Sequence, residues 1–155
     1  MSIELSRILQ VYAELLDMGV ELDSDPIAYG PKRLNNKTAE VRNMLSRCER
    51  IAMDVTESLH KCKRKLMIEN TDFELQMDSL LATDPEVRAG RSTEERKALG
   101  NARLKEARIR IATLNAEIQD LESLVKAVKM KRSDLKDIQG RLRDQRNLCL
   151  DEIGL

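Results

Sequence analysis

The fold of this chain is decided by residues Ser92–Ile153, STEERKALGNARLKEARIRIATLNAEIQDLESLVKAVKMKRSDLKDIQGRLRDQRNLCLDEI. Ser92 and Glu95 have the spacing of a capping box at the start of a helix. Apolar residues then recur at steps of four and three, which is typical of a helix that coils around a partner helix. We therefore expect one helix of about 60 residues, roughly 90 Å long, that needs a neighbour. Its apolar line is Leu104, Ala107, Ile111, Leu114, Ile118, Leu121, Val125, Val128, Leu135, Ile138, Leu142 and Cys149.

The neighbour is expected earlier in the same chain, between about Pro31 and Ala82. The connecting segment TDPEVRAGR, residues 83–91, offers Asp84 as a helix cap, Pro85 at a first helical position and Gly90 as a stop. A connection this short should fold the two helices back as an antiparallel coiled-coil hairpin. The apolar line of the earlier helix is Leu34, Thr38, Val41, Leu45, Cys48, Ala52, Val55, Leu59, Cys62, Leu66 and Phe73.

A short amphipathic helix is expected before the hairpin, from Ser2 to Met18, with Gly19 placed to end it. The sequence thus predicts an all-α fold in two parts. Residues 1–33 form the N-terminal helix and a Pro/Gly connector, and residues 34–155 form the hairpin. Docking of the first helix on the hairpin and its use in subunit contacts both stay open.

The composition favours a homo-oligomer. Charged residues make up 35% of the chain and aromatic residues only 2%, as in coiled coils and long helices. Apolar residues outside the two lines, at Leu99, Ile109, Leu124 and Met130, would remain uncovered on a single hairpin. We expect oligomer contacts from seven residues of the last helix: Ile118, Leu121, Val125, Val128, Leu135, Ile138 and Leu142.

Several classes of protein are excluded by what the sequence lacks. It has no GxxxxGK[ST], HExxH or GxSxG motif, so we expect no enzyme and no cofactor. Cys48 and Cys62 are about 21 Å apart on one helix, too far to share a disulfide or a metal, and the single His60 reads as a surface residue. We therefore expect no metal site, and reduced core cysteines in a cytoplasmic protein. No apolar run of about 18 residues is present to span a membrane, and the N-terminus lacks the features of a signal peptide.

Charge is balanced overall, with 27 basic and 27 acidic residues, but it is arranged in bands. If the bend centres near Val87, residue n lies opposite about residue 174 − n. A basic run then faces Arg108 and Arg110, and the acidic residues Asp54 and Glu57 face other acidic residues near Glu117. A charge run of this kind is typical of a solvated charged face, and like charge beside like charge raises the expectation that an anionic ligand meets the positive zone. The basic run is Lys61, Lys63, Arg64 and Lys65.

The order of parts resembles the recombination-mediator family of T-even-type phages, over about residues 34–146. STEERKALGNA (Ser92–Ala102) is similar to the opening of that family's last helix, and LVKAVKMKRSDLKDIQGRLRDQ (Leu124–Gln145) is similar to its closing segment. The basic run matches by kind and place the family's DNA-contacting cluster. The neutral net charge departs from the family pattern, and the N-terminal helix and connector are not part of it.

The resemblance implies a small, non-enzymatic homo-oligomer in the host bacterial cytoplasm. It would bind single-stranded DNA, help to displace the single-strand-binding protein and load a RecA-type recombinase. With so few aromatic residues, contacts would be to phosphates rather than to stacked bases. The alternative class is a coiled-coil scaffold, assembly chaperone or inhibitor that acts through protein–protein contacts. Retention on single-stranded DNA at low and high salt separates the two classes.

Overall fold

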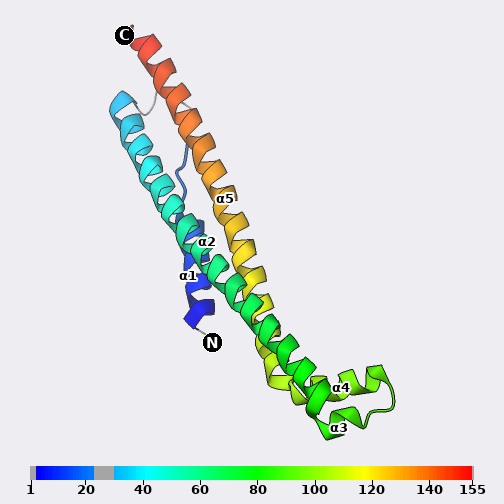
Figure 1. The fold of residues 1–155 in the computed structure, drawn as a ribbon. Helices are drawn as coiled ribbons and strands as arrows, with labels where there is room; N and C mark the ends of the chain where they lie inside the picture. Colours follow the sequence, from blue (N-terminus) through cyan, green and yellow to red (C-terminus); the bar gives the residue numbers. More distant parts are fainter. Residues whose placement is uncertain (1–2, 23–29, 155) are drawn as a thin grey trace. The chain divides into compact units, whose positions relative to one another are not determined.

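The structure, a computed structural model, describes residues 3–22 and 30–154, and nearly all of them are α-helical (Figure 1). The all-α prediction is confirmed, since no β-strand occurs within these two ranges. The two long helices α2 and α5 pack together as a helical hairpin, as their matching apolar lines predict. The helices are α1 (Ile3–Asp17), α2 (Gly30–Thr83), α3 (Pro85–Arg88), α4 (Thr93–Arg103) and α5 (Lys105–Ile153).

The chain divides into two compact units, and each long helix contributes to both. The first unit, Met1–Thr56 and Glu122–Leu155, contains α1, the first part of α2 and the last part of α5. Its core is formed by apolar residues of both hairpin arms: Leu34, Val41, Cys48, Val128, Leu135 and Leu142 are at most 1% exposed. An ion pair across the arms joins Arg132 Nη2 to Glu49 Oε1 at 3.1 Å.

In the first unit, α1 docks on the hairpin of its own chain. Met18 is 1% exposed, and its Sδ accepts a hydrogen bond from Cys48 Sγ at 3.4 Å. An ion pair between Arg47 Nη2 and Glu14 Oε2, 3.8 Å long, lies beside this contact. The docking alternative for the N-terminal helix, left open by the sequence, is therefore the one observed.

The cysteines are buried, as expected for core residues. Cys48, Cys62 and Cys149, all within the described ranges, form no disulfide. Burial raises the pKa of the Cys48 thiol, and the nearby positive charge of Lys131 offsets this only in part. The neutral thiol is thus the form that Cys48 keeps in the folded chain.

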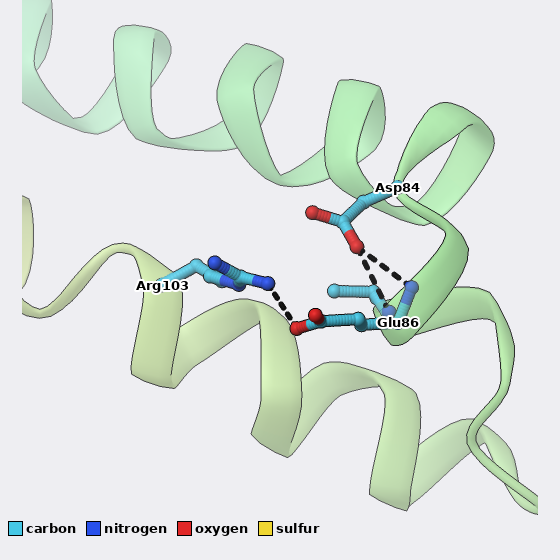
Figure 2. A network of polar contacts seen from close by, with 4 residues as sticks. Asp84, Glu86 and Arg103 are labelled. Atoms are coloured by element: carbon cyan, nitrogen blue, oxygen red, sulfur yellow. Dashed lines mark hydrogen bonds and ion pairs between the residues drawn. The ribbon is translucent and has the colours of Figure 1, made fainter.

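The second unit, Glu57–Leu121, contains the connection between the hairpin arms. Asp84 caps α3 as expected, because its carboxylate accepts hydrogen bonds from the amides of Glu86 and Val87 at 2.9 and 3.1 Å (Figure 2). Val87 is 1% exposed and anchors this turn. The Arg103 guanidinium forms an ion pair with the Glu86 carboxylate, which ties α4 to α3 (Figure 2).

The expected capping box at the start of α4 is formed with one difference. The Ser92 hydroxyl accepts a hydrogen bond from the Glu95 amide at 3.1 Å. The Glu95 carboxylate accepts from the amide of Arg91 at 2.8 Å, one residue before the position that the motif predicts. The helix therefore begins where the sequence indicates.

The prediction of one uninterrupted helix from Ser92 to Ile153 is wrong at Leu104. This residue leaves helical geometry, with φ −98° and ψ 26°, and α5 begins directly after it. The break coincides with contacts that hold α4 to its neighbours. Gly100 lies against the end of the flexible Met77 side chain of α2, where an added Cβ atom would lie 2.5 Å from Sδ, and the Arg103–Glu86 ion pair ties the end of α4 to α3. The Leu104 amide still donates to the Gly100 carbonyl at 3.1 Å, so the break leaves it hydrogen-bonded.

Gly90 provides a test of the connection. A Cβ atom there would lie 2.8 Å from Arg96 Cγ and 3.1 Å from the Arg96 amide nitrogen, so Gly90→Ala must shift the backbone at the start of α4. We expect a loss of about 1–3 kcal/mol in the free energy of unfolding, measured by urea denaturation. The matched control is Gly140→Ala in α5, where a Cβ meets nothing within 4 Å. That change should stabilise by about 0.5–1 kcal/mol, because alanine favours helix over glycine. Equal stability of the two variants would contradict this account of the connection.

The residues expected at an oligomer contact are used inside one chain. Ile118, Leu121, Val128, Leu135 and Leu142 are at most 8% exposed without any second copy. Val125 and Ile138, the other two of the set, are half-buried. Five of the seven thus pack within the single chain, and their use as oligomer contacts stays a prediction.

Other apolar side chains do remain on the surface. Of the four expected there, Leu99, Ile109 and Met130 are 38%, 54% and 69% exposed. Leu124 is only 1% exposed, so its expected exposure is wrong. Leu99, Ile109 and Met130 therefore offer apolar surface outside the apolar line of α5.

Candidate nucleic-acid interface

The basic run lies in the middle of α2, within the second unit, and all four of its cations are exposed. Cys62, between them in sequence, is 4% exposed and points into the core. Each residue of an α-helix is rotated by about 100° from the one before it. The run is therefore spread around the helix: Lys61 and Lys65 lie on one side of the buried line, Lys63 lies on the other, and Arg64 lies on the outer face, nearly opposite Cys62.

The surface of α2 beside this run carries a shallow depression. His60, Lys63, Arg64 and Met67 border this depression, which is largely open to solvent and is referred to below as the hollow. These residues are spaced at i, i+3, i+4 and i+7, so they lie on one face of α2. The site combines two cations, an imidazole that can donate a hydrogen bond, and a thioether that is part of a 67% exposed side chain. The sequence analysis did not include His60 and Met67 in the site. Their spacing of three and four residues from Lys63 and Arg64 would have predicted that all four share a helix face.

The opposite flank is partly neutralised. Lys61 Nζ lies 2.6 Å from Glu57 Oε1 of the preceding turn, an i, i+4 ion pair. Both side chains are more than half exposed, so the pair contributes little to stability and water screens it. The positive charge of Lys61 is thus less available to a ligand than its place in the run indicates.

The cations expected from α5 are not gathered with the run. Arg110 Nε donates a hydrogen bond to Glu69 Oε2 at 3.1 Å, which joins α5 to a part of α2 beyond the run. Arg108 is exposed. Of the six predicted binding residues, the structure therefore groups Lys63 and Arg64, and it adds His60 and Met67 to them.

Arg108 and Arg110 lie away from the basic run because the register of the two hairpin arms differs from the predicted one. The same difference shows that the predicted charge bands were wrong. The numbers of the paired residues add to 179 for Glu69 and Arg110 and to 181 for Glu49 and Arg132, where about 174 was expected. With sums near 180, Lys63 falls opposite the position of Glu117 rather than near Arg110. Opposite charges, not like charges, therefore face each other across the hairpin arms.

Other kinds of site find no support in the described part of the chain. Within residues 3–22 and 30–154, no group of three or more His, Cys, Asp or Glu side chains is arranged to hold a metal ion. None of the helices in these ranges combines the length and apolar character needed to span a bilayer. The chain matches no protein-family model, no curated protein and no solved structure.

Proposed function

We propose that this protein is a non-enzymatic binder of single-stranded DNA that acts as a recombination mediator. The observation that carries the proposal is the hollow on α2, where Lys63 and Arg64 lie beside His60 and Met67. Two neighbouring cations at an exposed surface can each contact a phosphate of a single strand. Phosphate contacts of this kind supply affinity and no base specificity. Binding should therefore be weak, sensitive to salt and nearly blind to sequence.

The mediator role follows from the resemblance of residues 34–146 to the phage family. A protein that holds a strand by its phosphates leaves the bases accessible to a recombinase. Its partners would be the single-strand-binding protein, which it helps to displace, and a RecA-type recombinase, which it helps to load. It would act in the bacterial cytoplasm, where such strands are exposed.

Removal of the two cations from the hollow should weaken DNA binding in a defined way. The double change Lys63→Ala and Arg64→Ala should lower the slope of log affinity against log salt by about 1.4, because each phosphate contact on a single strand contributes about 0.7. The loss should be the same for strands of different sequence. Fluorescence anisotropy of a labelled single strand, measured at several salt concentrations, gives both quantities.

The matched control carries the same loss of charge at another place in the second unit. Arg91→Ala with Lys97→Ala also removes two exposed cations, both close to the start of α4. This control should keep the salt slope of the parent. Equal salt slopes for all three proteins, or no binding by the parent at low salt, would contradict the proposal that the hollow binds DNA.

A second candidate function is favoured by the exposed apolar side chains. Leu16 on α1 and Met53 on α2 are 81% and 73% exposed, and burial of such apolar surface against a partner protein would be favourable. We therefore keep a scaffold, assembly chaperone or inhibitor as the alternative to the mediator. This candidate predicts no binding of DNA at any salt concentration, so the anisotropy measurement of the parent separates the two.

A further inference from the structure

The outer face of α2 in the second unit carries a second line of heptad spacing, which the hairpin does not use. It passes through Ile68 and Leu75, which are 58% and 63% exposed although both are large and apolar. The line points away from the buried one, since Cys62 is 4% exposed and Leu59 is 9% exposed on the opposite face. Its members follow steps of three and four: Lys61, Arg64, Ile68, Thr71, Leu75 and Asp78.

Charge along this line changes sign at its apolar centre. The basic run precedes Ile68, whereas the segment from Glu69 to Asp84 contains five acidic residues and no basic one. Two parallel copies of such a helix would place like charges side by side. Two antiparallel copies would place the basic end of one against the acidic end of the other.

We propose that a second copy of this chain docks on this face, with the two α2 helices antiparallel about a two-fold axis between residues 69 and 70. The occupant is a second copy because the face is complementary to itself in this orientation. Ile68 then packs on the Thr71 methyl group of the other copy. The aliphatic part of Arg64 covers Leu75 of the other copy, while its guanidinium stays at the edge of the contact, in water. Lys61 at one end of the line meets Asp78 of the second copy.

The flanking positions give the same complementarity. In this register Lys65 of one copy lies beside Asp72 of the other, and the two-fold axis repeats the pair. Both side chains are exposed in the single chain. Within one α2 they are seven residues apart, about 10 Å along the axis, so they cannot be i, i+4 partners of each other. A Lys65–Asp72 interaction is therefore specific to the assembled state.

A charge exchange tests the proposal. Lys65→Asp alone and Asp72→Lys alone each place like charges together at two points of the interface, and each should raise the dissociation constant of self-association by about tenfold or more. The double variant restores opposite charges and should return the constant to within about threefold of the parent. Sedimentation velocity over a range of protein concentrations measures it, with no DNA present. The measurement therefore reports self-association alone, and its failure is distinguishable from a failure of DNA binding.

Two controls accompany these variants. Met130→Asp changes a 69% exposed apolar residue of α5 in the first unit and should leave the dissociation constant unchanged. Circular dichroism should show parental helicity for every variant, because all the altered side chains are exposed. A parent that stays monomeric up to about 100 μM overturns the proposal. So does a double variant that associates no better than the single variants.

Discussion

Leu135→Asp is expected to unfold the first unit of this protein near room temperature or only slightly above it. Leu135 is 0% exposed at the centre of the contact between α2 and α5. A carboxylate there loses its hydration and gains no partner, which costs about 3–5 kcal/mol. For a unit of this size, that loss corresponds to a fall in Tm of roughly 15 °C or more. Thermal melting followed by circular dichroism measures it.

The pH dependence of this variant identifies the cause. Burial raises the pKa of the introduced carboxyl in the folded state above its unfolded value, so the folded state binds the proton more tightly. The stability of the variant relative to the parent should therefore recover as the pH falls towards the acid range. Met130→Asp, at a 69% exposed position of the same helix, should change the free energy of unfolding by less than about 0.5 kcal/mol at neutral pH. A Leu135→Asp protein that melts like the parent would contradict the assignment of the apolar line.

The apolar lines were the part of the fold that the sequence predicts well. Burial of side chains at four-three spacing depends on helical geometry alone, so Leu34, Val41, Leu135 and Leu142 are all in the core as expected. The caps at Asp84 and elsewhere in the connection were equally readable, since they depend on neighbours in sequence.

Features that depend on contacts between residues distant in sequence could not be predicted. The break at Leu104 lies where α4 contacts α2 and α3, through Gly100 beside Met77 and the Arg103–Glu86 ion pair, and no local pattern encodes these contacts. The register depends on how many residues α3 and α4 take up in the connection. An error of about six residues there changed which charges face each other, as the pair of Glu69 and Arg110 shows.

The candidate site was predicted in part for the same reason. The basic run was visible in the sequence, and helix geometry alone shows that its four cations point in different directions around α2. The grouping of Lys63 and Arg64 with His60 and Met67 follows from their spacing on one helix, so it could have been predicted from the sequence. The pairing of α5 cations with α2 carboxylates was not, because it required the register.

A large effect is also expected on the loading of a RecA-type recombinase, which is the proposed mediator role. A recombinase of the RecA type hydrolyses ATP only after it assembles on a strand, and a strand already covered by single-strand-binding protein delays that assembly. A mediator that holds the phosphates through the hollow on α2 should shorten the delay several-fold. Lys63→Ala with Arg64→Ala should abolish most of this effect, whereas Arg91→Ala with Lys97→Ala should keep it.

The most direct measurement is therefore the lag before ATP hydrolysis on covered single strands, with recombinase and single-strand-binding protein from the same genetic system. We expect the parent protein to shorten the lag at low salt and to lose this effect as salt is raised, because phosphate contacts weaken with salt. A lag that is unchanged by the parent at every salt concentration, while the recombinase remains active on bare strands, would contradict the mediator function and favour the scaffold.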